Sequence, residues 1–185
     1  DSMEAEFGTP MPRRHGLDVA GTIEAFIEGT AKALVCLGGN FLRAIPDTER
    51  AERALAEAAL TVHVSTKLNR SHVITGRTAL ILPTLGRTEL DEQHSGSQFV
   101  TVEDSMGLVH RSRGVLPPAG PRLRSEVAIV TELAEALAHA GLMAEIEGVR
   151  WAEFRDDYDT VRERIARVIP GFERFNARVR QPAGI

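Results

Sequence analysis

Three short apolar runs dominate the first half of the chain. They span residues 33–37, 60–64 and 79–82, and each ends at a glycine, serine or proline. Runs of this length and composition are typical of strands buried on both faces of a parallel sheet. Cys36, the only cysteine, falls inside the first run, where we expect it to be a small buried hydrophobic residue.

Amphipathic stretches separate the runs. Residues 18–29 and 46–58 carry apolar side chains at helical spacing, and Asp18 and Asp47 are suited to cap their first turns. Helices that alternate with buried strands predict an α/β fold. We expect a Rossmann-like three-layer sandwich, with a mostly parallel sheet and helices on both faces.

The second half has a different pattern. Residues 99–103 and 108–111 alternate around a turn and predict a hairpin or a pair of edge strands. Residues 125–140 form the most regular helical pattern, closed by Gly141, and residues 151–169 predict a last helical stretch. Residues 170–181 form a charged tail, in which we expect Phe172 and Phe175 to be either exposed or docked.

These patterns divide the chain into three expected segments. Residues 1–15 form a linker or a lead-in introduced by cloning, residues 16–142 form the α/β domain, and residues 143–185 form a C-terminal helical extension that packs on the same domain.

Composition narrows the possible partners. The chain has 185 residues, 43% of them hydrophobic and 26% charged, with a net charge of -4. This balance is that of a soluble globular protein and argues against a nucleic-acid or membrane-surface partner. The polar, acidic start does not resemble a secretory signal. With one cysteine, neither an internal disulfide nor a cluster held by several thiolates of this chain can form.

A polar edge is expected where the strands end. Gly38, Gly39 and Asn40 follow the first run, the polar stretch 65–72 follows the second, and the long loop 84–97 follows the third. Ligands of open α/β sheets bind at the carboxyl ends of the strands, and glycine lets the backbone approach them closely. Taken alone, the two glycines fit a tight turn equally well.

Familiar catalytic patterns are missing from this edge. The third glycine and the following acid of a dinucleotide fingerprint are absent, and no phosphate-binding P-loop pattern occurs. The histidines lack metal-ligand spacing, and Asp91, His94 and Ser95 are too close in sequence for an ordinary triad. We therefore expect no catalytic residue and no metal ligand, but a site that binds a phosphate-bearing nucleotide.

Five segments carry a resemblance to a known family: residues 38–42, 65–72, 81–89, 100–106 and 170–176. Their order and spacing resemble the third domain of molybdopterin oxidoreductases of the dimethyl sulfoxide reductase family, in its formate dehydrogenase alpha-subunit-like branch. The resemblance covers about residues 15–182, nearly the whole chain.

The resemblance implies a cofactor and a set of site residues. Enzymes of that family hold molybdenum or tungsten between two molybdopterin guanine dinucleotides, and this domain holds the nucleotide end of one of them. Carried over, Gly38, Gly39 and Asn40 would approach the phosphates or ribose, Ser65, Thr66, Lys67 and Asn69 would contact the phosphates and guanosine, and Arg87 and Glu103 would lie nearer the pterin. Glu103 fits an exposed acid on an edge strand equally well.

Departures from the family point to a domain rather than a whole enzyme. The cysteine or selenocysteine that binds the metal, the cysteines of the 4Fe-4S cluster that many members carry, and the C-terminal barrel have no counterpart here. The resemblance thus implies a domain excised from a cytoplasmic oxidoreductase, inactive and without bound cofactor by itself. Its partners would be the remaining domains and the molybdopterin guanine dinucleotide.

Two alternatives remain open. One is a free-standing small α/β nucleotide-binding enzyme that uses His94 or Asp91, and the other is an interaction module without a ligand. Exposed apolar surface at Phe172, Phe175 and the last helix would also leave self-association of the isolated domain open.

Overall fold

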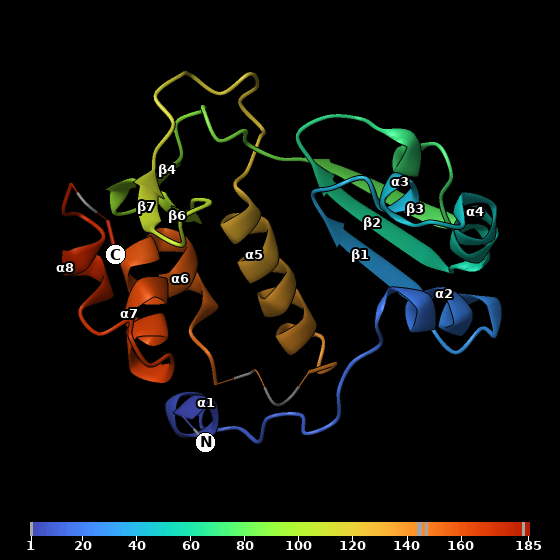
Figure 1. Cartoon of the computed structure of the whole chain (residues 1–185), viewed down its shortest axis with the longest axis horizontal. Coiled ribbons are helices and arrows are strands. Elements are labelled where there is room, and N and C mark those ends of the chain that lie inside the picture. Colours follow the sequence, from blue (N-terminus) through green and yellow to red (C-terminus); the bar gives the residue numbers. More distant parts are fainter. Residues whose placement is uncertain (1, 144–145, 147, 183) are drawn as a thin grey trace. The chain divides into compact units, whose positions relative to one another are not determined.

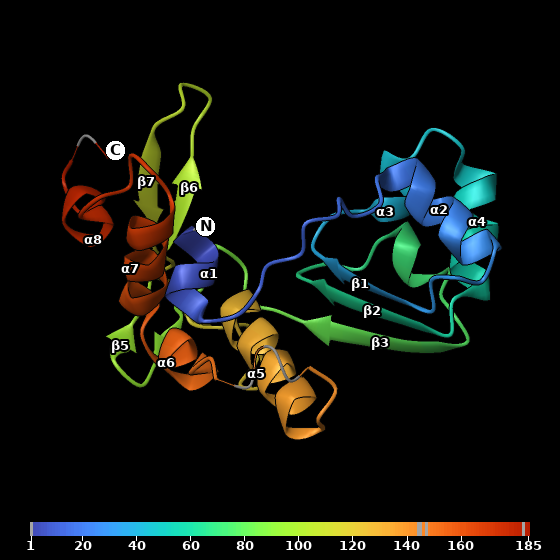
Figure 2. The ribbon, with the colours of Figure 1, turned by 90° about the horizontal axis from the view of Figure 1, so that it is seen from below.

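The computed structural model describes residues 2–143, 146, 148–182 and 184–185. Within them the chain forms two compact units, one of residues 13–84 and one of residues 1–12 with 85–185 (Figures 1 and 2). The segment boundaries expected from the sequence stay a prediction, and four positions of the expected extension (144, 145, 147 and 183) lie outside the described residues.

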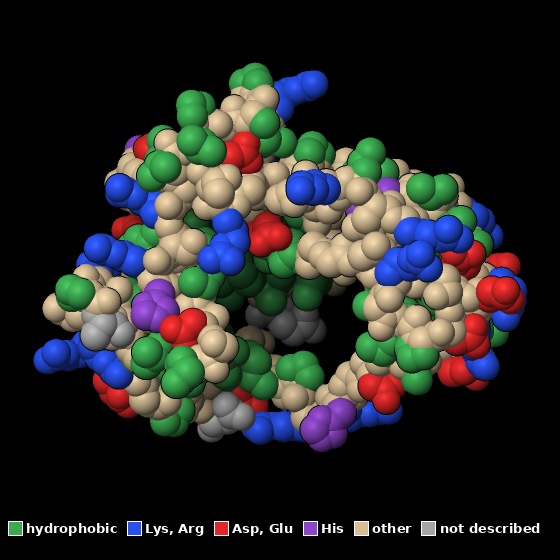
Figure 3. All heavy atoms as spheres, turned by 45° about the horizontal axis from the view of Figure 1, so that its top comes forward, with side chains coloured by type: hydrophobic (Ala, Val, Ile, Leu, Met, Phe, Trp, Pro, Cys, Tyr) green, Lys and Arg blue, Asp and Glu red, His purple; other side chains and the backbone are tan. Residues whose placement is uncertain are grey.

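The surface carries charges of both signs. On the face that Figure 3 shows, Lys and Arg side chains are interspersed with Asp and Glu side chains rather than gathered into one basic area. In the described part of the chain, no helix combines the length and the apolar character needed to cross a bilayer.

The unit of residues 13–84 is a parallel α/β unit. Its three strands are parallel in the order β1-β2-β3, and Val35 of β1 and Leu80 of β3 both pair with Val62 of β2. This confirms the predicted Rossmann-like α/β fold. Its elements are α2 (Val19–Ile27), β1 (Ala33–Leu37), α3 (Phe41–Ala44), α4 (Thr48–Glu57), β2 (Leu60–Ser65), the 3₁₀ turn η1 (Arg70–His72) and β3 (Thr78–Pro83).

The predicted helix starts are confirmed in this unit. The Asp18 carboxylate accepts a hydrogen bond from the Gly21 N–H at 2.7 Å, and the Asp47 carboxylate accepts one from the Arg50 N–H at 3.1 Å. Both bonds satisfy N–H groups that the first turn of a helix leaves unpaired.

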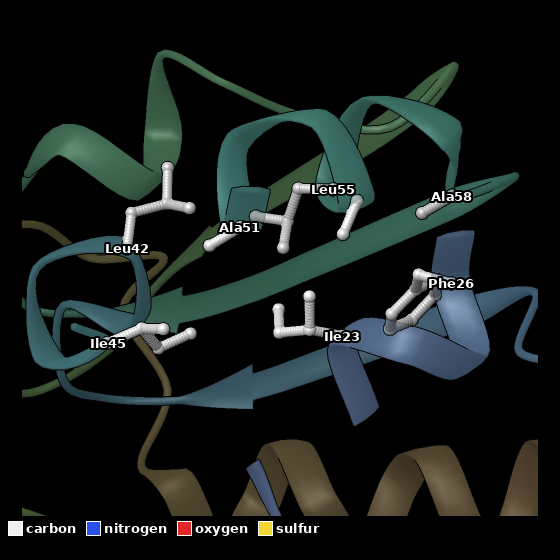
Figure 4. Close-up of a cluster of buried hydrophobic side chains, with 8 residues drawn as sticks. Ile23, Phe26, Leu42, Ile45, Ala51, Leu55 and Ala58 are labelled. Atoms are coloured by element: carbon white, nitrogen blue, oxygen red, sulfur yellow. The ribbon is translucent and has the colours of Figure 1, made fainter. Parts of the chain in front are cut away.

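The core of this unit lies between its helices and one face of the sheet (Figures 2 and 4). Leu42 of α3 and Leu55 of α4 are fully buried. No helix of residues 13–84 lies on the opposite face, so this unit does not supply a second helical layer. The cluster comprises Ile23, Phe26, Leu42, Ile45, Ala51, Ala54, Leu55 and Ala58.

The expectation that the first and third strands are buried on both faces is wrong. Val35 and Leu37 of β1 are each 53% exposed, and Leu80 of β3 is 48% exposed, whereas the central strand β2 is buried over most of its length. The reason is that β1 and β3 are edge strands with one covered face. Cys36 is accordingly only half-buried, which is still enough for desolvation to raise the pKa of its thiol.

The second unit joins small antiparallel sheets to helices. The predicted hairpin is confirmed as β6 paired with β7, and the predicted helix after Ser125 is confirmed as α5, whose first turn the Ser125 hydroxyl caps. Its elements are α1 (Ser2–Phe7), β4 (Glu92–Gln93), β5 (Gly96–Ser97), β6 (Val100–Glu103), β7 (Val109–Ser112), α5 (Glu126–His139), α6 (Trp151–Asp156), α7 (Tyr158–Val168) and α8 (Phe175–Arg178).

The last helical stretch, predicted over residues 151–169, is divided in the structure. It is divided into α6 and α7 at Asp157, whose backbone is extended and whose carboxylate accepts from the Asp159 N–H to start a new helix. In the tail that follows, the sequence left Phe175 either exposed or docked, and the structure docks it: Phe175 is buried and contacts Phe172 edge to face, with 4.9 Å between ring centroids. Phe175 therefore adds nothing to an exposed apolar surface.

A buried tyrosine ties three segments of the second unit together. Tyr158 of α7 is 2% exposed, and its hydroxyl lies 2.5 Å from Asp91 Oδ2 and 2.6 Å from Ser125 Oγ. Its main-chain N–H donates to the side-chain oxygen of Gln98. Burial, followed by the hydrogen bond to Asp91, raises the pKa of the Tyr158 hydroxyl far above its usual value.

Tyr158→Phe tests this network. We expect it to lower the free energy of unfolding by about 1–3 kcal/mol, because Asp91 and Ser125 lose a shared partner. Urea denaturation followed through the fluorescence of Trp151, the only tryptophan and a residue of the same unit, measures the change. An unchanged free energy would show that water replaces the hydroxyl without loss.

Gly76→Ala tests the packing of the other unit. A Cβ at Gly76 would lie 2.6 Å from the Ala58 carbonyl oxygen, so α4 and the loop before β3 would have to separate. We expect a loss of about 1–3 kcal/mol, the usual cost of overpacking.

Gly16→Ala is the matched control for Gly76→Ala, because a Cβ at Gly16 meets nothing within 4 Å. Native-state hydrogen exchange of the β2 amides measures both variants. Equal effects of the two substitutions would contradict the packing argument.

Candidate functional site

The loops after β1 and β2 begin at the same edge of the sheet. Leu37 pairs with Val64, and Ser65 pairs with Pro83, so all three strands end side by side. This confirms the expectation that the glycine turn and the polar stretch share one edge. Such an edge is the usual ligand site of open α/β sheets.

The two glycines form a left-handed turn. Gly38 has φ 69° and Gly39 has φ 70°, values that strain any residue with a Cβ. The Gly38 N–H donates to the Val64 carbonyl at 2.8 Å and thereby anchors the turn to β2. A Cβ placed on Gly39 would meet nothing within 4 Å, so the backbone there is open to a close approach.

Asn69 links the glycine turn to the loop after β2. Its side-chain Nδ2 donates to the Gly39 carbonyl at 2.8 Å, and its Oδ1 accepts from the Ser71 N–H at 3.0 Å. The sequence predicts that this amide contacts a sugar or base, and in this structure it joins two loops across thirty residues of chain. A direct ligand contact by Asn69 stays a prediction.

Ser71 makes the second link between these loops. It is 1% exposed, its hydroxyl donates to Asn40 Oδ1, and the same oxygen accepts from the Leu42 N–H, both at 3.1 Å. Ser71 was not among the predicted site residues, although it stands in the donor-rich stretch 65–72. The signal for Ser71 in the sequence was Asn69, two residues earlier, because an asparagine side chain often forms a hydrogen bond with the main chain two residues later.

Lys67 is an exposed cation in the loop after β2. The Ser65 hydroxyl donates to the Lys67 carbonyl at 2.8 Å and shapes the turn, while Thr66 and Lys67 are exposed. No residue in the described part of the chain pairs with the Lys67 side chain. Arg70, by contrast, donates through Nε and Nη2 to Glu52 Oε1 at 2.9 and 2.6 Å, so its charge is already matched.

Arg87 and Glu103 belong to the second unit. Arg87 donates to Ser112 at the long distance of 3.5 Å, and Glu103 is exposed at the end of β6. Val100 pairs with Ser112, and Glu103 pairs with Val109, so Ser112 and Glu103 lie at opposite ends of the hairpin. At the usual strand rise, these two ends are about 10 Å apart. The structure does not bring Arg87 and Glu103 together.

A cavity of about 630 Å³ lies in the second unit and is lined by Asp91, Gln93 and Ser125, among others. Asp91 accepts from Gln93 and Tyr158, whereas the Ser95 hydroxyl accepts from Gln98. No described hydrogen bond joins Asp91, His94 and Ser95 into a triad. Among the described residues, no three His, Cys, Asp or Glu side chains are gathered so that they could hold a metal ion.

Comparison with known proteins places the chain within longer relatives. No family model matches the chain. It is 50% identical over 183 residues to uncharacterized oxidoreductase Rv2900c of Mycobacterium tuberculosis, and 45% identical over 178 residues to protein YdeP of Escherichia coli K12. The matches cover 99% and 96% of this chain but 23% of each relative, so the chain spans about a quarter of the length of the curated relatives that it matches.

Proposed function

We propose that the chain acts as a cofactor-binding domain of a larger oxidoreductase. In this proposal the edge formed by the ends of β1 and β2 holds the guanosine–pyrophosphate end of a molybdopterin guanine dinucleotide. The observation that carries the proposal is the exposed Lys67 ammonium, which has no partner among the described residues, on the same sheet edge as an open double-glycine turn. Together they offer a cation and close backbone approach to a diphosphate.

The donor set at this edge suits a diphosphate. The Thr66 hydroxyl and the Lys67 ammonium are exposed donors in one turn, and a Cβ placed on Gly39 would meet nothing within 4 Å, so an anion can approach the backbone there. Asn69 and Ser71 hold the two loops in register, so little of the binding free energy would be lost in ordering them.

The cofactor, when bound, would supply the redox chemistry through its molybdenum or tungsten. Residues of this chain would bind and orient its nucleotide end, and we assign none of them to proton or electron transfer. The most specific part of the proposal is that the larger protein has formate dehydrogenase-like chemistry. This part rests on the five segments that carry the family resemblance.

The comparisons support the more general part of the proposal, that the chain is a domain of a larger oxidoreductase. The mycobacterial relatives carry the name of an oxidoreductase, and they are about four times as long as the chain. A domain that holds one end of a large cofactor would need such additional domains to complete the cleft.

Calorimetric titration with GDP, with ADP as the comparison, tests the proposed site. We expect binding that prefers GDP and that Lys67→Met weakens at least about tenfold, because a charge-assisted bond to phosphate is lost.

Lys32→Met is the matched control, since Lys32 is the only other lysine and stands just before β1, at the opposite edge of the sheet. It should leave the affinity unchanged. GDP binding that both variants weaken equally, or that neither weakens, would place the nucleotide away from this edge.

A further inference from the structure

The sheet of residues 13–84 has two lateral edges, which run along its outermost strands, β1 and β3 (Figure 2). The remaining strands of the described residues pair among themselves, β4 with β5 and β6 with β7. Each outermost strand of the parallel sheet therefore has one side that no other strand in the described part of the chain covers. Such a side is a template for pairing with a further strand.

The hydrogen bonds after β1 show which main-chain groups lie on its uncovered side. The Gly38 N–H donates to the Val64 carbonyl at 2.8 Å, so the even-numbered residues of β1 direct their main-chain groups toward β2. Because these groups alternate between the two sides of a strand, the N–H and C=O groups of Ala33, Val35 and Leu37 point away from β2. Within the described residues, no hydrogen bond reaches them. We call this row of groups the lateral edge of β1.

The lateral edge of β3 is blocked by a proline. The Thr78 and Thr84 N–H groups donate to the carbonyls of Ala59 and Ser65, at the two ends of β2, so the even-numbered residues of β3 face β2. Pro83 is odd-numbered and lies on the outer side. Proline has no N–H to donate, and natural sheets place it on an edge strand to prevent further pairing.

The strand β1 lacks the features that protect an edge strand. Its sequence, Ala-Leu-Val-Cys-Leu, contains no proline and no charged side chain, and its pairing with β2 runs from Ala33 to Leu37 without a bulge. Val35 and Leu37 are each 53% exposed, whereas parallel sheets are normally covered on both faces. Unpaired main-chain groups and uncovered apolar side chains therefore occur on the same strand.

We propose that the lateral edge of β1 is an interface for a further strand, supplied by a part of the longer protein outside these 185 residues. The relatives support this source, because the chain matches only 23% of their length and the remainder is long enough to hold such a strand. The added strand runs parallel to β1, as the three strands present run parallel to one another, and packs apolar side chains against Val35 and Leu37. The inference concerns how the sheet is completed and holds whichever ligand the strand ends bind.

Hydrogen exchange resolved to single amides by mass spectrometry tests this interface. It compares the full-length protein that carries this chain with the isolated 185-residue chain. The Val35 and Leu37 amides should exchange at least about tenfold more slowly in the full-length protein, the factor for one net hydrogen bond. The Cys36 amide, which faces β2, should be protected in both and shows that the unit is folded.

Val35→Pro separates main-chain pairing from side-chain packing. Proline removes an N–H that points away from β2, so it should spare the bond of the Cys36 amide to β2. It should break the added pairing and lower the protection of the Leu37 amide in the full-length protein by about tenfold. Val35→Thr is the matched control, because threonine has a similar shape, favours strands and keeps the N–H, so Leu37 should stay protected.

Three results would overturn the interface. The first is exchange of the Val35 and Leu37 amides in the full-length protein at the rate of an unstructured chain. The second is equal protection of Leu37 in Val35→Pro and Val35→Thr. The third is protection that falls when the full-length protein is diluted, because that dependence would identify a second copy as the source of the strand. If Val35→Pro or the isolated chain does not fold, the first and third results decide from the native full-length protein alone.

Discussion

Parallel pairing of β2 with both of its neighbours is the constraint on which the unit of residues 13–84 depends. Parallel strands need a crossover connection, which is why α3 and α4 separate β1 from β2. The same pairing brings the ends of all three strands to one edge. The glycine turn and the loop 65–72, far apart in sequence, are therefore neighbours and can be joined by hydrogen bonds.

Most polar groups at this edge bond to one another. Asn69, Ser71 and Asn40 form a network that fixes the two loops, and Arg70 is matched by Glu52. Thr66 and Lys67 are exposed polar side chains next to this fixed framework. This arrangement favours a site in which the hydrogen-bonded framework positions the backbone, while Lys67 and the open backbone of the glycine turn contact the anion.

Local signals made much of the fold predictable. The strands, the caps at Asp18 and Asp47, the helix after Ser125 and the hairpin follow from patterns within a few residues, and the structure confirms them. Burial of β1 and β3 was mispredicted because it depends on what covers the sheet, which no local pattern records. The link from Asn69 to Gly39 depends on the sheet register, so it too lies beyond sequence patterns.

The most direct test of the account is the cofactor content of a purified full-length protein that carries this chain. Acid hydrolysis followed by chromatography measures released GMP, and mass spectrometry of the elements measures molybdenum and tungsten. The account predicts one of these metals together with two guanine nucleotides for each metal ion. A folded full-length protein, isolated from cells that make the cofactor, with neither metal nor GMP would contradict it.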